Sequence, residues 1–443
     1  MADSISSEPF AAGRRPAHLP ERLTISFPIW ALQDTGAGGA YHDVDRFFRE
    51  HKERGFNCVR FDDGAGVADF HAGAQARMPQ VVEAFPGYSR LLRQSWCTGP
   101  GGECDLKERL FAFCEASHRH GVKLILSSWY YLHTHWYCGD DELNRRLHSL
   151  APAERYAYFA AELELLLDEL KARGYLDTIA FVEIFNESDG LGFVNFRADG
   201  SRLPPEEQHL FRSLHEKALQ HLQEEFPEVL FAVDTATPYT NAELFPRNAS
   251  LWNFHSYYMW DIYRVFERNL LRAGTDVDDP AELGDACDFF VENPVPLDQI
   301  RKLRDGKTSA PEDWFRRVWL YGNMDLEKTG ELDRRFAREF LRRDDEYRRN
   351  FAEVLEHVTA FRDWLCPGRP LVMGEGVTFC ASPSFHWEER TPEYWEHLVW
   401  TSRLCRRSGL WGKVVRTCCG PEDPCWYETP EQLLRVNNAF LNE

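Results

Sequence analysis

The same order of apolar and polar residues recurs six times along the chain. A helical stretch such as 44–56 (VDRFFREHKERGF) has apolar residues three or four positions apart, and the apolar strand NCVRF follows at once. The other five helical stretches lead into apolar strands at 122–129, 179–187, 229–237, 371–376 and 411–419. A Gly or Pro separates most of these pairs, and Gly supplies the left-handed cap that ends a helix. The pattern therefore predicts helices that alternate with buried strands.

Two further apolar strands complete the set, at 23–30 (LTISFPIW) and 250–258 (SLWNFHSYY). Eight strands in sequence, most of them followed by helices, indicate a parallel sheet. Their nearly continuous apolar runs are typical of strands covered on both faces. We therefore predict an α/β fold, the closed (β/α)8 TIM barrel. The first strand is not followed by GxGxxG, which argues against a dinucleotide-binding sheet.

The spacing of these elements predicts the domain organisation. Residues 1–22 are expected to form a lead-in, and residues 23–443 a single (β/α)8 domain. A Gly- and Pro-rich connection separates strands two and three, and an insertion at 259–359 separates strands six and seven. Connections that follow barrel strands lie over the C-terminal face, so we expect both to form a lid or pocket wall. Alternatively, the insertion is an oligomerisation element, in which case the protein would form a homo-oligomer.

Composition narrows the possible partners. The formal net charge of −20 argues against nucleic acid and against anionic membrane surfaces as partners. The sequence contains no run of 18 apolar residues, the length that spanning a bilayer requires. The N-terminus lacks the apolar core of a secretory signal. The twelve cysteines are then best explained as reduced, mostly buried thiols, which predicts a cytoplasmic protein.

Polar and aromatic residues gather where the predicted strands end. The stretch FVEIFNESDG begins as a buried strand and ends in four polar residues. A barrel presents such strand ends to its ligand, which explains why polar groups lie there. The candidate site residues at or just beyond the strand ends are Trp30, Arg60, Asp63, Trp129, Asn186, Glu187, Asp234, His255, Tyr257, Glu375 and Trp426.

Two of these candidates are carboxylates on strands that face each other. Glu187 ends strand four and Glu375 ends strand seven, so a ring of eight strands places them across its mouth. Carboxyl groups about 5–5.5 Å apart suit retaining glycoside hydrolysis, with one as acid/base and the other as nucleophile. Arg60 and Tyr257 are positioned to keep the nucleophile ionised, and Asn186 to bind the sugar 2-OH.

The motifs IFNE on strand four, HSY on strand six and a Glu that closes strand seven resemble those of clan A glycoside hydrolases, especially the cellulase-like, family 5-like branch. The resemblance covers the barrel and implies retention, with Glu187 as acid/base and Glu375 as nucleophile. It further implies Asn186 as the 2-OH partner and Arg60, His255 and Tyr257 as supporting residues. Two strand ends depart from the pattern: Ser128-Trp129 stands where many cellulases have His, and Cys418-Cys419 where a Trp is common.

These observations predict a retaining exo-type β-glycosidase that acts on a small soluble oligosaccharide or glycoside, with no cofactor and no metal. Trp30, Trp129 and Trp426 are expected to stack on sugar rings, and Asp63 and Asp234 to bind them. A transglycosidase would use the same residues, and a non-catalytic carbohydrate-binding barrel would keep the aromatic ones. A metal-dependent barrel hydrolase is a further alternative, although His133-Thr134-His135 lacks obvious partner ligands and the cysteines lack the CxxC spacing of zinc ribbons.

Overall fold

Eight parallel strands close into a barrel in the computed structural model, which describes residues 15–28, 31–32, 39–62, 75–78, 102–129, 149–189, 205–263, 288–302, 319, 323–325, 327–378 and 385–442. Around the barrel the strand order is β1-β10-β9-β8-β7-β6-β5-β2. The strands are β1 (Leu23–Ser26), β2 (Cys58–Asp62), β5 (Lys123–Ser127), β6 (Ile179–Glu183), β7 (Phe231–Thr235), β8 (Leu251–Ser256), β9 (Leu371–Gly376) and β10 (Gly412–Val414). Each lies within a strand predicted from the sequence, except that β2 extends one residue past the predicted NCVRF, and the (β/α)8 prediction is confirmed.

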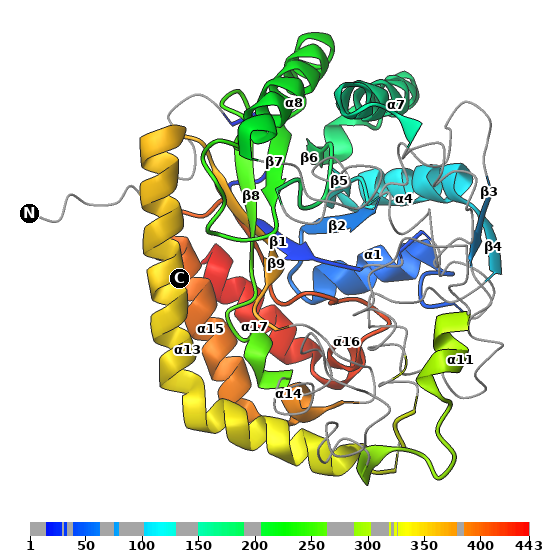
Figure 1. Cartoon of the computed structure of the whole chain (residues 1–443), viewed down its shortest axis with the longest axis vertical. Coiled ribbons are helices and arrows are strands. Elements are labelled where there is room, and N and C mark those ends of the chain that lie inside the picture. Colours follow the sequence, from blue (N-terminus) through cyan, green and yellow to red (C-terminus); the bar gives the residue numbers. More distant parts are fainter. Residues whose placement is uncertain are drawn as a thin grey trace, which may run out of the picture.

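Helices surround the barrel and cover the outer face of its strands (Figure 1). The longer ones are α1 (Val44–Glu53), α4 (Leu106–His120), α7 (Pro152–Arg173), α8 (Pro205–Glu225), α13 (Thr329–Leu365), α15 (Pro392–Arg407) and α17 (Pro430–Leu441). Short turns of helix are η1 (Leu176–Thr178), η3 (Trp260–Tyr263), α11 (Leu297–Lys302), α14 (Trp387–Arg390) and α16 (Pro424–Glu428). Every residue of β2, β6, β7, β8 and β9 is buried, as apolar strands covered on both sides require.

The two long connections contain regular structure of their own. Between β2 and α4, β3 (Gln75–Met78) pairs antiparallel with β4 (Gly102–Asp105), where the Gly- and Pro-rich sequence predicted only a loop. The insertion at 259–359 contains η3, α11 and most of α13. Helix α13 is 37 residues long and packs along α15, so the boundary at 359 lies inside it (Figure 1). One helix thus serves both as the end of the insertion and as the barrel helix before β9.

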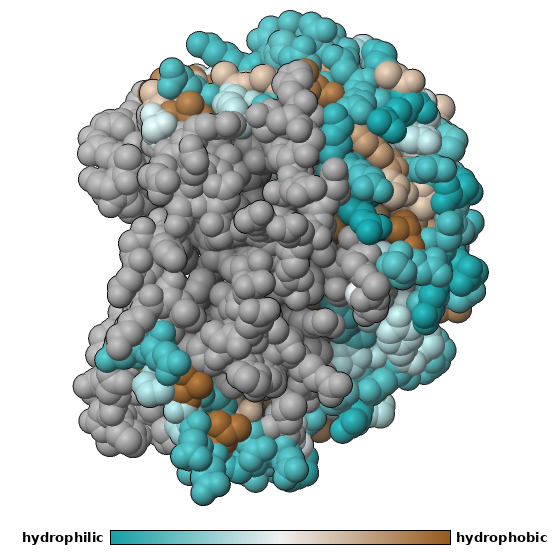
Figure 2. Space-filling model, turned by 90° about the vertical axis from the view of Figure 1, so that its right-hand side faces the viewer, coloured by the Kyte–Doolittle hydropathy of each residue, from teal (hydrophilic) through white to brown (hydrophobic). Residues whose placement is uncertain are grey.

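The surface of the described residues bears on possible partners. Hydrophobic residues are scattered among hydrophilic ones on the face in Figure 2, as is usual for protein surfaces. No described helix combines the length and the apolar character that crossing a membrane requires. The cysteines whose side chains are described are all buried, and none of them forms a disulfide.

A glycine beside the predicted nucleophile permits a close approach between two strands. A Cβ atom on Gly376 would lie 2.6 Å from the backbone oxygen of Ser256 on β8. We predict that Gly376→Ala destabilises the fold by about 2 kcal/mol or more, because backbone atoms must move apart. Gly174→Ala is the matched control: Gly174 has a left-handed φ of 77° but no atom near its Cβ position, so about 1 kcal/mol of strain is expected. Equal losses in urea unfolding would contradict the close approach.

Candidate active site

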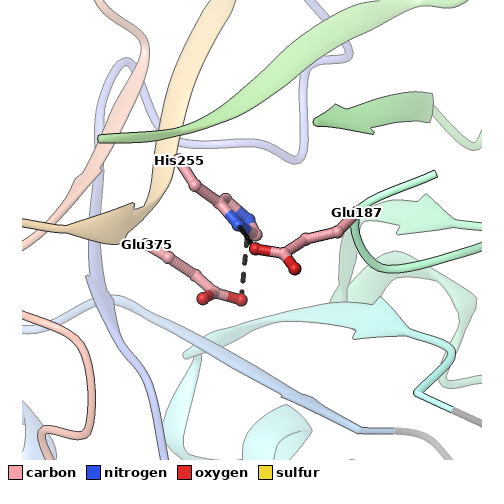
Figure 3. Close-up of side chains that lie close together, drawn as sticks. All are labelled: Glu187, His255 and Glu375. Carbon is pink, nitrogen blue, oxygen red and sulfur yellow. Dashed lines mark hydrogen bonds and ion pairs between the residues drawn. The ribbon is translucent and has the colours of Figure 1, made fainter. Parts of the chain in front are cut away.

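Three side chains from different strands converge at the C-terminal end of the barrel (Figure 3). Glu187 follows β6, whereas His255 and Glu375 are register partners on β8 and β9. His255 Nδ1 lies 2.7 Å from Glu187 Oε1, and its Nε2 lies 3.5 Å from Glu375 Oε1. One carboxylate oxygen of each glutamate and a ring nitrogen of His255 all lie within 4.8 Å of one another. The fold therefore brings the two predicted carboxylates together, with an imidazole between them.

Arg60 on β2 binds several of the predicted site residues at once and is fully buried. Its Nη1 donates to Glu375 Oε1 at 2.7 Å. Its Nη2 donates to Asn186 Oδ1 at 2.7 Å and to Asp234 Oδ2 at 3.1 Å. A fourth partner is Glu183, whose Oε2 lies 2.8 Å from Nη2. A single guanidinium thus fixes the relative positions of groups from three strands or their ends, β6, β7 and β9.

Asp234 at the end of β7 holds the backbone of the predicted acid. Its Oδ2 accepts from the amide of Glu187 at 2.9 Å, and its carbonyl accepts from Ser188 Oγ at 2.9 Å. Glu187 has a positive φ of 54°, which costs a non-glycine residue about 1–2 kcal/mol. Val377 and Cys418, just past β9 and β10, have positive φ as well. Such backbone strain is known to cluster at functional sites, where neighbouring contacts maintain it.

Tyr257 and Thr417 enclose the other oxygen of Glu375. The Tyr257 hydroxyl donates to Glu375 Oε2, and Thr417 Oγ1 lies 3.3 Å from the same hydroxyl. Thr417 Oγ1 also accepts from the amide of Gly376 at 2.9 Å. Both oxygens of Glu375 are therefore engaged, whereas the buried Oε2 of Glu187 has no hydrogen-bond partner in the described structure. That oxygen of Glu187 is the one left for a ligand.

The electrostatics of the site follow from burial and from two cations. Burial raises the pKa of Glu375 above its ordinary value, and the charges of His255 and Arg60 oppose the rise. Burial alone would lower the pKa of His255, but Asp234 and Glu375 raise it well above its ordinary value. Burial likewise opposes ionisation of Asp234, yet His255 and Arg60 lower its pKa. The site therefore holds His255 as an imidazolium among carboxylates.

Glu187, His255 and Glu375 form the group of possible metal ligands found among the described residues. A histidine must be neutral to bind a metal ion. Here His255 directs Nδ1 to Glu187 and Nε2 to Asp234 at 2.9 Å, and its raised pKa favours the cation. The arrangement suits an ion-pair network better than a metal centre.

The predicted aromatic residues have different positions. Trp129 is wholly buried, with the Arg60 guanidinium 5.3 Å from its ring centre, so it lies at the edge of the site. The prediction for Trp426 is wrong. Its ring stacks on Phe47 and Phe56, and its Nε1 donates to Glu50, so it belongs to the contact between α16 and α1 outside the barrel. Trp30, Asp63 and the motif His133–His135 lie outside the described residues.

Two buried residues of the site were missed by the sequence reasoning. Glu183 on β6 contacts Arg60, and Asn253 on β8 contacts Glu183. A signal was present: each lies two or four residues before a predicted site residue, in a strand that is otherwise mostly apolar. A polar side chain inside such a strand needs a buried partner.

Solved structures of other proteins share the fold of this chain. The structure of a protein described as a glycoside hydrolase from Parabacteroides distasonis ATCC 8503 superposes with a TM-score of 0.62 at 16% identity, covering 95% of this chain and 93% of that chain. A family 5 mannosidase from Rhizomucor miehei has a TM-score of 0.46 at 11% identity, with 98% of both chains covered. A family 5 lichenase from Caldicellulosiruptor sp. F32 has a TM-score of 0.45 at 11% identity, covering 89% of this chain and 84% of that one. No curated protein sequence matches this chain.

Fold and site together define a (β/α)8 barrel with two opposed carboxylates at its C-terminal end. A family model described as sugar-binding cellulase-like matches residues 26–281, more than half of the chain. The chain belongs to this sugar-binding cellulase-like family, and the resemblance to cellulase-like TIM barrels is confirmed.

Proposed function

We propose that this protein is a retaining exo-type β-glycosidase that hydrolyses a small soluble oligosaccharide or glycoside. The observation that carries the proposal is the approach of carboxylate oxygens of Glu187 and Glu375 to within 4.8 Å. Retaining enzymes have their two carboxyl groups about 5–5.5 Å apart, whereas inverting enzymes leave roughly 6.5–9.5 Å for a water molecule. Of these two geometries, the short separation favours direct attack by one carboxylate.

In the first step, Glu375 attacks the anomeric carbon while Glu187 protonates the departing glycosidic oxygen. The attacking carboxylate is oriented by Arg60 and Tyr257, which hold its two oxygens. In the second step, Glu187 removes a proton from water, which releases the sugar from Glu375 with net retention. His255 stabilises whichever of the two carboxylates is ionised, since it contacts both.

The exo preference and the substrate size are inferred from the lengths of the connections that follow the barrel strands and from family membership. Long connections follow β5, β6 and β8 at the end where the carboxylates lie, and such connections can enclose a pocket for a chain end. The name of the Parabacteroides protein supports the reaction class. The cysteines that the structure describes are buried and form no disulfide, which suits a reducing compartment, so we propose a cytoplasmic enzyme whose substrate is short and soluble.

The proposal is tested with a panel of aryl β-glycosides, followed by NMR of the first-formed sugar anomer. We expect hydrolysis of at least one glycoside and release of the β-anomer before mutarotation. Release of the α-anomer would show inversion and contradict the roles proposed for the two glutamates. Failure of every β-linked substrate, with a sugar still bound, would favour a carbohydrate-binding barrel.

A metal-dependent hydrolase is the second candidate, because Glu187, His255 and Glu375 could supply three ligands to one ion. Elemental analysis of the purified protein separates the two candidates. About one equivalent of a divalent metal that is lost in His255→Ala would favour the metal enzyme. Full activity after dialysis against a chelator would favour the glycosidase that needs no metal.

The pH dependence of the proposed reaction reports the ionisation of Glu375. Since its pKa is raised by burial, we predict that kcat/KM falls on acidification at a higher pH than an ordinary glutamate would give. In Arg60→Gln this acidic limb should move to still higher pH, because a cation that opposes the rise is removed. Arg119→Gln is the control, because Arg119 on α4 forms an exposed ion pair with Asp45. A limb that stays fixed or moves to lower pH in Arg60→Gln would contradict the role of Arg60.

A further inference from the structure

Beneath the proposed catalytic pair lies a third glutamate that the reaction does not use. Glu183 is the last residue of β6 and is fully buried inside the barrel. Arg60 approaches it from one side: Nη2 and Nε lie 2.8 and 3.2 Å from Glu183 Oε2, and Nε lies 3.4 Å from Oε1. Oε2 thus receives the two shorter contacts from the guanidinium, and Oε1 receives only the longer one.

The oxygen Oε1 of Glu183 faces the side chain of Asn253 on β8. The amide nitrogen Nδ2 lies 2.5 Å from Oε1, while the buried Oδ1 of Asn253 has no hydrogen-bond partner in the described structure. A separation of 2.5 Å lies within the range of an O–H···O bond. The two ends of an amide are placed by hydrogen-bonding logic, so they can be exchanged. Exchange pairs Oδ1 with a hydroxyl of Glu183 and places Nδ2 in the buried position that Oδ1 occupied.

The balance of charges at the site also favours a protonated Glu183. The buried cations are Arg60 and His255, and the carboxyl groups around them are Glu183, Glu187, Asp234 and Glu375. The proposed first step needs Glu187 protonated and Glu375 ionised, so Glu375 and Asp234 already balance the two cations. A third anion would leave an uncompensated buried charge in the barrel, which is strongly unfavourable.

The environments of the two remaining carboxyl groups separate them. Burial raises the pKa of Glu183, Arg60 opposes the rise, and the charge of Asp234 adds to it. Asp234 has the additional contact with His255, and its pKa is lowered. Two carboxyl groups on one guanidinium are thus pushed toward opposite protonation states.

We propose that Glu183 is a positioning residue that carries a proton on Oε1, donates it to Asn253 and, through Oε2, orients Arg60 toward Glu375. This inference rests on the proposed glycosidase function for its kinetic consequences, whereas the location of the proton can be tested without activity. Glu183 touches no reacting atom. It acts through Arg60, which holds the nucleophile at 2.7 Å.

Matched substitutions test the positioning role. Glu183→Gln keeps a neutral carbonyl for Arg60 and a donor for Asn253, so kcat/KM should stay within about 3-fold of wild type with an unchanged acidic limb. Glu183→Ala removes both, and we expect a loss of about 10–100-fold, mainly in kcat, with the acidic limb moved to higher pH. If Glu183 were ionised, Glu183→Gln would remove an anion near Glu375 and move the acidic limb to lower pH. That outcome would overturn the proposal.

Infrared spectroscopy locates the proton in protein labelled with ¹³C-glutamate. Near neutral pH, Glu183→Gln should remove one protonated-carboxyl band, while Glu375→Gln should leave that band in place. An unchanged band in Glu183→Gln would refute the proposal, and circular dichroism confirms that each variant is folded. If the wild type hydrolyses no glycoside, the infrared result still decides where the proton lies, so failure of this inference and failure of the proposed function are distinguishable.

Discussion

Replacement of Glu375 by alanine is expected to lower kcat on an aryl β-glycoside by at least ~10⁴-fold. The carboxylate is fully buried, and Arg60 and Tyr257 hold its two oxygens, so the proposed nucleophile has a fixed orientation. Removing it eliminates the covalent route itself, whereas removing a supporting contact only weakens it. The change in kcat should therefore be large even with the most activated leaving group, and steady-state kinetics with a dinitrophenyl glycoside measure it.

A small anion can occupy the space that this substitution opens. Azide should restore part of the activity of Glu375→Ala by attacking from the vacated side, and the product should be a glycosyl azide of inverted configuration. Glu162→Ala is the control, because Glu162 is a buried glutamate of α7 on the outside of the barrel. Near-normal activity of Glu375→Ala, or a glycosyl azide with retained configuration, would assign the nucleophile to another residue.

The barrel could be predicted from the sequence because each of its units has a local signal. At Gly174, for example, the cap of α7 has φ of 77° and its amide contacts Leu170 and Lys171, as a glycine after a helix predicts. The strands after such caps are short apolar runs, and right-handed connections leave few ways to arrange eight of them. Glu187 and Glu375 follow from the same reasoning, since strand ends of a barrel meet at one face.

The features that could not be predicted depend on contacts between segments far apart in the sequence. Trp426 lies a few residues past the strand-eight cysteines, and only the packing of α16 against α1 places its ring beside Phe47 rather than at the site. Glu183 is one acid in an apolar strand until the closed barrel brings Arg60 and Asn253 to it. The full length of α13 was also missed, because most of it, up to residue 359, was assigned to an insertion rather than to a helix that packs along α15.

Glu187→Ala should show a second large effect, and one that depends on the leaving group. With an alkyl or weakly acidic phenyl glycoside, the departing oxygen needs the proton of Glu187, so kcat/KM should fall by roughly 10²–10⁴-fold. With a dinitrophenyl glycoside the departing oxygen needs no proton, so kcat/KM should fall far less. The difference between the two substrates isolates proton donation from any general disturbance of the site.

The second step of the same variant provides its own test, because Glu187 must also activate water. With the dinitrophenyl substrate, the glycosyl-enzyme on Glu375 should accumulate and be visible by mass spectrometry. Azide needs no base, so it should accelerate turnover and give a glycosyl azide of retained configuration, opposite to that from Glu375→Ala. Equal losses for both leaving groups would contradict the acid role of Glu187. A glycosyl azide of inverted configuration would require the two glutamates to exchange their proposed roles. Since Glu187 Oε2 is the unpartnered oxygen and both oxygens of Glu375 are engaged, the structure favours Glu187 as the acid/base and Glu375 as the nucleophile.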